Sequence, residues 1–135
     1  MTALFGTNVL LDVLPDRTHA ENSLFLLDRS RQGAIAGMVT PTVLTNTFYV
    51  GRSTAGKKAA RDFVESALSF LDVASVSHAG ATRAVRRYDD FEDGIIGEAA
   101  AEHGTGVICT RNADDFGPAR TQVLTPGELA RLLKT

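Results

Sequence analysis

Two short segments of the chain hold the side chains that could carry out chemistry. Residues 89–93 read DDFED and open a predicted helix with four acids. Residues 107–116 read VICTRNADDF, so an apolar strand runs directly into hydroxyl, guanidinium, amide and carboxylate groups. Polar groups of this kind at a strand end are typical of a ligand site in an α/β protein.

Asp93 is the candidate functional carboxylate of the first segment. Gly97 and Ala100 fall on the same face of the predicted helix, and small residues there leave open space that a metal ion or phosphate would need. A structural role is the alternative, because the helix dipole favours carboxylates in a first turn. In the second segment, Asn112 and Asp114 could likewise serve only as turn residues.

The elements that must position these residues alternate along the chain. Apolar runs predict short strands at residues 3–5, 34–39, 73–76, 106–109 and 122–124. Helical spacing predicts helices at residues 9–14, 17–31, 41 to about 51, 56–71, 78–87, 92–102 and from 126 onward. Thr40-Pro41 and the Thr125/Glu128 capping box mark two of the helix starts.

This alternation predicts an α/β fold with a parallel sheet covered on both faces. Residues 1–135 are expected to form a single domain, because no repeat or linker interrupts them. The crevice of such a sheet lies at the carboxyl ends of its strands. We therefore expect the site among residues 6–8, from Thr40, from Ser77, and at residues 110–112.

Composition excludes several classes of protein. With 135 residues, 14 Lys+Arg, 16 Asp+Glu and 44% hydrophobic residues, the chain is neither disordered nor strongly basic. One cysteine excludes an internal disulfide and zinc sites built on cysteine pairs. The longest apolar runs fall far short of a membrane span, and the first residues have no basic region of a signal peptide. A cytoplasmic protein is expected.

Several motifs, in order, resemble those of PIN-domain proteins of the VapC-type toxin ribonuclease family. They lie at residues 5–12 (FGTNVLLD), 42–50 (TVLTNTFYV), 90–94 (DFEDG), 110–116 (TRNADDF) and 124–126 (LTP). The resemblance covers nearly the whole chain. It implies a three-layer α/β/α fold around a mostly parallel sheet of four to five short strands.

The resemblance further implies an endoribonuclease that depends on Mg²⁺ or Mn²⁺ and is the toxin of a toxin–antitoxin pair. On this interpretation Asp93 and Asp115 are the metal-site carboxylates. Thr110 and Asn112 orient them or the attacking water, and Asn8 contacts the metal ligands rather than the metal itself. A bound metal also removes a conflict of charge, because the acids would otherwise repel RNA.

Two positions depart from the family pattern. Asn46 stands where many members have Glu, although its amide oxygen can still bind a metal. Gly6 replaces the first Asp and has no side chain to bind anything, so we expect cleavage to be impaired. Gly6 is either the natural residue of an inactive or weakly active relative or an introduced inactivating substitution. Asp12 is expected to lie too far along the first helix to substitute for the lost Asp.

The expected partners are RNA, a small antitoxin protein and a second copy of the chain. Arg111 is the best-placed candidate for a phosphate contact, followed by Arg86 and Arg87. The apolar faces of residues 9–31 and 43–61 are candidate dimer surfaces. A second hypothesis, favoured by Gly6, is a non-catalytic PIN scaffold that binds RNA or an antitoxin without cleavage.

Overall fold

The computed structural model describes residues 1–14 and 20–134. Its five strands are β1 (Thr2–Phe5), β2 (Ala36–Val39), β3 (Asp72–Val73), β4 (Val107–Cys109) and β5 (Gln122–Leu124). The α-helices are α1 (Thr7–Leu11), α2 (Glu21–Arg31), α3 (Pro41–Ala55), α4 (Lys57–Leu68), α5 (His78–Arg87), α6 (Phe91–Glu102) and α7 (Pro126–Lys134), and η1 (Ala113–Phe116) is a short 3-10 helix.

The strands form one parallel sheet in the order β3-β2-β1-β4-β5. β1 occupies its centre, where Leu4 is paired with Met38 of β2 on one side and with Ile108 of β4 on the other. Ala3, Leu4 and Phe5 are completely buried. A central strand covered on both faces explains why β1 is apolar at every position from Ala3 onward. The predicted α/β fold, with helices flanking a parallel sheet, is confirmed.

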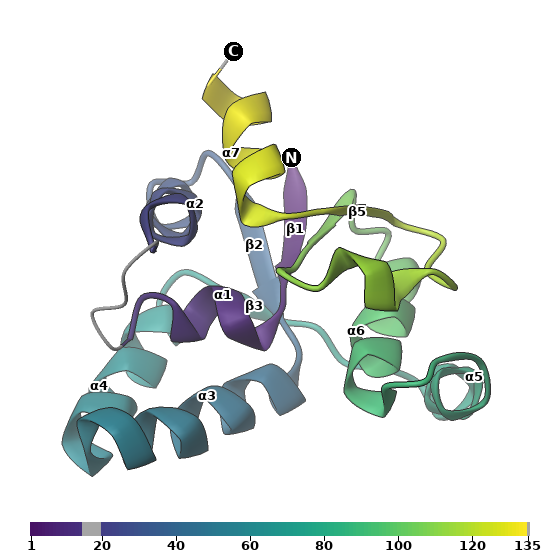
Figure 1. Cartoon of the computed structure of the whole chain (residues 1–135), viewed down its shortest axis with the longest axis horizontal. Coiled ribbons are helices and arrows are strands. Elements are labelled where there is room, and N and C mark those ends of the chain that lie inside the picture. Colours follow the sequence, from purple (N-terminus) through teal and green to yellow (C-terminus); the bar gives the residue numbers. More distant parts are fainter. Residues whose placement is uncertain (15–19, 135) are drawn as a thin grey trace.

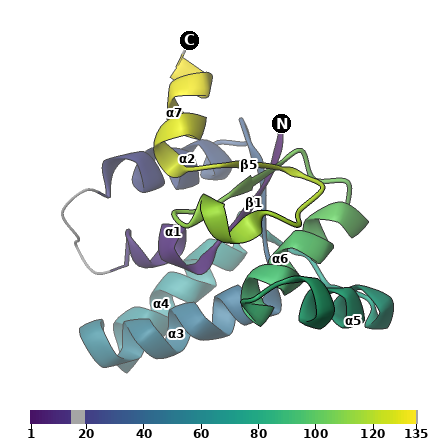
Figure 2. The same cartoon turned by 45° about the vertical axis from the view of Figure 1, so that its right-hand side comes forward.

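The parallel arrangement brings the carboxyl ends of β1 and β4 to the same edge of the sheet. Figure 1 shows α1, α3 and the start of α6 gathered around these strand ends, whereas α2 and α7 lie toward the opposite ends. In Figure 2 the pairs α3–α4 and α5–α6 lie on different sides of the strand ends. The residues that follow β1 and β4 therefore lie near both α3 and α6.

Two helix starts form as predicted from side-chain caps. Thr40 Oγ1 accepts a hydrogen bond from the Val43 amide at 3.3 Å, and Pro41 occupies the first helical position. Thr125 and Glu128 exchange two hydrogen bonds at the start of α7, each side chain accepting from the other's backbone amide. The bond from the Thr125 backbone amide lowers the pKa of the Glu128 carboxyl.

The prediction that a helix ends near Gly51 is wrong, because α3 continues to Ala55. A Cβ atom at Gly51 would lie 2.1 Å from Leu14 Cδ2, so this glycine permits close packing against residue 14. The helix ends instead before Gly56, whose φ of 94° is unfavourable for residues with a side chain. The next helix, α4, begins at Lys57 and ends at Leu68, earlier than predicted.

Other boundaries also differ from the prediction. β3 covers only Asp72–Val73, rather than residues 73–76, because its partner β2 ends at Val39 and leaves nothing beyond to pair with. β2 begins at Ala36, since the amides of residues 34 and 35 bond instead to the Arg29 carbonyl. The first helix begins two residues early, at Thr7. Of the predicted helix at 17–31, residues 21–31 are helical, and residues 17–19 lie outside the described part of the chain.

Across residues 1–14 and 20–134, none of the helices combines the length and the apolar character that crossing a bilayer requires.

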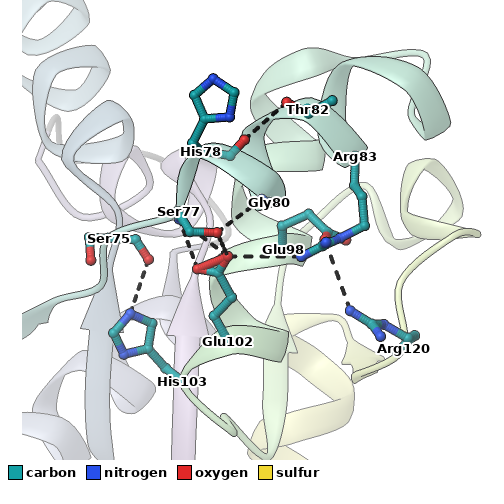
Figure 3. A network of polar contacts seen from close by, with 10 residues as sticks. All are labelled: Ser75, Ser77, His78, Gly80, Thr82, Arg83, Glu98, Glu102, His103 and Arg120. Atoms are coloured by element: carbon teal, nitrogen blue, oxygen red, sulfur yellow. Dashed lines mark hydrogen bonds and ion pairs between the residues drawn. The ribbon is translucent and has the colours of Figure 1, made fainter.

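A partly buried ion pair joins α5 to α6. Arg83 Nε donates to Oε1 of the buried Glu98 at 2.5 Å, and Arg120 approaches the same oxygen at 4.0 Å (Figure 3). Ser77 adds a second link, because its backbone amide and its hydroxyl both donate to Glu102 of α6. The helices approach closely, since a Cβ on Gly94 would lie 2.9 Å from Ala84 Cβ. α6 is therefore held firmly at the side of the sheet.

We predict that Arg83→Ala lowers the free energy of unfolding by about 1–3 kcal/mol. The substitution leaves the Glu98 carboxylate buried with only the more distant Arg120, and a buried charge without its partner is costly. Arg31→Ala is the matched control, because Arg31 pairs with Asp28 on the exposed face of α2. Urea denaturation should show a change below about 0.5 kcal/mol for the control. Equal losses in the two variants would contradict the role of Glu98.

Candidate active site

A cavity of about 300 Å³ opens at the carboxyl ends of β1 and β4. The loops after these strands, the middle of α3 and the first turn of α6 supply its walls. Its lining includes Gly6, Asn46, Glu92, Asp93, Thr110 and Asn112. The structure therefore brings together predicted site residues that are separated by more than one hundred positions in the sequence.

Asn112 joins the two predicted metal-site carboxylates. Its side-chain Nδ2 donates to Asp93 Oδ2 and to Asp115 Oδ2, each at 3.0 Å. The Thr110 hydroxyl in turn donates to Asn112 Oδ1 at 2.7 Å, and this bond fixes the orientation of the amide. Asp93 and Asp115 thus converge on one amide nitrogen, although Asp115 is exposed and lies outside the wall of the cavity.

The Asp93 carboxyl has an unusual pKa. Burial and the nearby charges of Asp90, Asp115 and Glu92 raise it from 3.8 to about 6, and the hydrogen bond from Asn112 opposes this rise only in part. The side chain is buried at the base of α6, with the residue 9% exposed. A carboxylate held in this way gains by meeting a cation.

The acidic run at residues 89–93 contributes both to the start of α6 and to the wall of the cavity. Asp90 caps α6, because its Oδ1 accepts the Asp93 amide at 3.0 Å. Asp90, Glu92 and Asp93 all line the 300 Å³ cavity, so Asp90 caps the helix and also faces the candidate site. Asp89, Asp114 and Asp115 line a neighbouring cavity of about 440 Å³, with Arg87 in its wall.

Glu92 is a cavity residue that the sequence analysis did not single out. Its two carboxylate oxygens accept hydrogen bonds from Thr7 Oγ1 at 2.8 Å and from Asn46 Nδ2 at 2.5 Å. Glu92 therefore bridges the start of α1 and the middle of α3. Its place between Phe91 and Asp93 in the acidic run was the available signal, but the hydrogen-bond partners come from distant parts of the chain.

Gly6 has an ordinary backbone conformation, with φ −78° and ψ 167°. A Cβ atom there would meet Thr110 Oγ1 at 3.4 Å and the Cys109 carbonyl at 3.7 Å, which are normal contacts. Neither the fold nor the space around the residue therefore requires glycine. A side chain at this position would enter the cavity beside Thr110.

The structure corrects one prediction about α6. Gly97 does not leave open space above Asp93, because a Cβ on Gly97 would lie 2.2 Å from the Tyr88 hydroxyl. Ala100, the other small residue, is completely buried in the core. The free volume near Asp93 lies instead toward Gly6, Asn46 and Thr110, which line the cavity.

Arg111 makes an ion pair rather than lying free for a ligand. Its Nη1 donates to Asp12 Oδ1 at 2.6 Å, and Ser23 Oγ donates to the other oxygen of this buried carboxylate. Asp12 is absent from the cavity wall, which agrees with the expectation that it does not replace the lost Asp. Arg86 and Arg87 are exposed in the last turn of α5, with Arg87 on the neighbouring acidic cavity.

The donor chemistry of the cavity fits a hard cation, although the set is small. Asp93 and Asp115 offer carboxylate oxygens, and Mg²⁺ is commonly held by one or two carboxylates with water and substrate phosphate. Within the described ranges 1–14 and 20–134, no three Asp, Glu, His or Cys side chains are grouped closely enough to hold a metal by themselves. A site of this kind would bind the cation weakly.

We predict that Asp93→Asn stabilises the fold above pH 6. A carboxyl whose pKa is raised on folding contributes fully to the free energy of unfolding at a pH below the pKa of the unfolded chain, near 4. This contribution is lost as the pH rises through the folded pKa of about 6. The asparagine side chain does not ionise, so the variant is not destabilised as the pH rises. Its free energy of unfolding at pH 7.5 should therefore exceed that of the original chain, by at most about 3 kcal/mol.

Chemical denaturation at pH 3.5 and pH 7.5 measures the difference. The control is Asp28→Asn, on an exposed surface pair of α2. An Asp93→Asn variant that is less stable than the original chain at pH 7.5 would contradict the prediction.

Comparisons with known proteins agree with this architecture. A family model described as the PIN domain matches residues 2–114. A toxin–antitoxin complex from Klebsiella pneumoniae contains a chain that is 25% identical, with a TM-score of 0.68 over 92% of this chain and 97% of that one. Curated proteins yield no significant match.

Two further solved structures share the fold at lower identity. VapBC2 from Rickettsia felis, bound to a DNA fragment from its promoter, has a TM-score of 0.69 at 15% identity over 93% of this chain and 98% of that chain. VapC20 from Mycobacterium tuberculosis, a toxin that cleaves the sarcin–ricin loop, has a TM-score of 0.63 at 15% identity over 78% and 86%. Together with its parallel sheet and its carboxylates at the strand ends, the match over residues 2–114 shows that this chain belongs to the PIN domain family.

Proposed function

We propose that residues 1–135 form a single PIN domain and that this domain is a VapC-like, metal-dependent endoribonuclease. It would be the toxin of a toxin–antitoxin pair, and Gly6 would impair its cleavage of RNA. The observation that carries the proposal is the convergence of Asp93 and Asp115 on the Asn112 amide, beside a cavity at the strand ends. Family membership and the likeness to a chain of a toxin–antitoxin complex support it.

Asp93 and Asp115 would hold Mg²⁺ or Mn²⁺. When bound, such an ion lowers the pKa of a water ligand and offsets the charge of the phosphate being cut. Asn112 keeps the two carboxylates close together, and Thr110 holds the Asn112 amide in the required orientation. Asn46 and Thr7 direct the Glu92 carboxylate along the cavity wall, so Asn46 acts as a hydrogen-bond donor here.

The loss of the Asp at position 6 weakens this site for an electrostatic reason. Three carboxylates around one cation bind it more tightly than two, because each adds a favourable interaction in a partly buried place. The cavity wall formed by the β1 end now offers Gly6, Thr7 and the exposed Asn8, none of which is charged. Cation binding then depends on the substrate phosphate and is correspondingly weak.

RNA is the proposed substrate, with Arg86 and Arg87 contacting phosphates beside the acidic cavities. Arg111 contributes chiefly by holding residues 110–112 against Asp12, and its half-exposed guanidinium keeps donors for a phosphate. The proposed partners are a small antitoxin protein and a second copy of the chain. The proposed location is the cytoplasm, where RNA is present. Leu24 and Tyr49, which are exposed on α2 and α3, lie on the proposed dimer faces.

A non-catalytic scaffold is the second candidate function. Gly6 favours it, because the backbone there does not need glycine and yet the side chain is missing. Such a scaffold would keep its surface for RNA or an antitoxin and lack cleavage.

We predict that Gly6→Asp increases Mn²⁺ affinity by about tenfold or more and brings about metal-dependent RNA cleavage. The Cβ of the new side chain makes only ordinary contacts beside Thr110, and its carboxylate adds a charged ligand at the cavity. Isothermal titration measures the affinity, and a fluorescent RNA assay measures cleavage.

Gly6→Asn is the matched control, because it has the same shape without the charge. The Gly6→Asp/Asp93→Asn double variant should lose the gain. Robust metal-dependent cleavage by the original Gly6 chain would contradict the proposed impairment. Tight RNA binding without cleavage, even by Gly6→Asp, would favour the scaffold.

We predict that Arg86→Gln/Arg87→Gln weakens RNA binding and reduces its dependence on salt. Each lost phosphate contact should lower the slope of log K against log [salt] by about 0.7 for single-stranded RNA. Fluorescence anisotropy of the original chain between low and moderate salt gives the slope. Arg131→Gln is the control, since Arg131 lies on the exposed side of α7, away from both cavities. A slope that the double substitution leaves unchanged would argue against these contacts.

A further inference from the structure

We propose that Tyr88 is a positioning residue that sets the separation of Asp93 and Asp115. Tyr88 ends α5 and is followed directly by the acidic turn into α6. Its ring touches both segments that carry the carboxylates, although the residue itself lines neither the 300 Å³ nor the 440 Å³ cavity. This inference rests on the proposed function, because the separation matters only if the two carboxylates act together.

The first contact is with α6. The Tyr88 hydroxyl would lie 2.2 Å from a Cβ on Gly97, and ring atom Cζ would lie 2.8 Å from it. Gly97 is four residues after Asp93, so the two share one face of the helix. The ring of Tyr88 therefore rests directly on the α6 backbone, one turn beyond the carboxylate.

The second contact is with η1. The Tyr88 ring packs edge-to-face against Phe116, with ring centroids 6.4 Å apart and an interplanar angle of 76°. Phe116 is buried and immediately follows Asp115. The buried Phe116 ring anchors the end of η1, and only one peptide unit separates its Cα atom from that of Asp115.

The hydroxyl group shows that shape matters more than hydrogen bonding here. Among the residues that the structure describes, Tyr88 Oη is the one buried side-chain polar atom without a hydrogen-bond partner. The residue is 6% exposed. Its ring fills the space between Gly97 and Phe116, and it thereby holds α6 and η1 at the distance that the Asn112 amide spans.

Three substitutions test the spacing. Tyr88→Leu removes the ring from between the segments, and Tyr88→Phe keeps it. Gly97→Ala pushes the ring outward from the α6 side without changing Tyr88. Leu26→Ala, on the buried face of α2, is a control for a general loss of stability, because Leu26 is completely buried and lines neither cavity.

The first measurement needs no metal. The side-chain amide signal of Asn112 in a ¹⁵N–¹H spectrum, assigned by its absence in Asn112→Asp, reports the two bonds to Asp93 and Asp115. We expect Tyr88→Leu and Gly97→Ala to shift this signal toward the position of a solvated amide and to speed its hydrogen exchange. Tyr88→Phe and Leu26→Ala should leave it in place. An unchanged Asn112 signal in Tyr88→Leu would overturn the proposal.

The second measurement is Mn²⁺ affinity in the Gly6→Asp background, at a temperature where every variant is folded. We expect about tenfold weaker binding in Tyr88→Leu, and a change below about twofold in Tyr88→Phe and Leu26→Ala. Equal weakening in Tyr88→Leu and Leu26→Ala would overturn the positioning role. If Mn²⁺ binds none of the chains, the proposed function fails, and the Asn112 signal alone still decides whether Tyr88 sets the spacing.

Discussion

The pair of hydrogen bonds from the Asn112 amide to Asp93 and Asp115 is the interaction on which the candidate site depends. Burial, followed by the charges of Asp90, Asp115 and Glu92, raises the pKa of Asp93 to about 6. The amide donor offsets part of that rise and keeps both groups at the strand ends. The arrangement places two carboxylates side by side, and their mutual repulsion favours the approach of a cation.

Three sets of contacts hold the segments around this interaction in place: those between β1 and β4, those of α6 with α5, and those of the loop after β4 with α1. The parallel pairing of β1 and β4 brings Gly6 close to Thr110, where the Gly6 amide donates to the Cys109 carbonyl at 2.9 Å. The Arg83–Glu98 pair and the close contact of Gly94 with Ala84 hold α6 against α5. The Asp12–Arg111 pair ties the loop after β4 to the end of α1. Each link uses a buried or partly buried contact, so the site is held from several directions.

Position 6 shows how stability and chemistry differ in their demands. Glycine there satisfies the backbone and leaves ordinary room for a side chain. The fold is therefore indifferent to a residue that the proposed metal site would need. Asn46 shows the reverse case, since its amide donates to Glu92 and would lose that bond if it were a carboxylate. Two departures from the family pattern thus have different physical consequences.

The sequence by itself determined the alternation of strands and helices and two helix caps, because these follow from local periodicity and capping chemistry. The grouping of Asp93, Asp115, Thr110 and Asn112 in one site came instead from the resemblance of the motifs to those of PIN-domain proteins. Only the tertiary structure decided that Tyr88 fills the space over Gly97, that Glu92 lies between Thr7 and Asn46, and that Arg111 is paired with Asp12. Contacts between residues far apart in the chain depend on how helices pack against the sheet, and no local pattern records that packing.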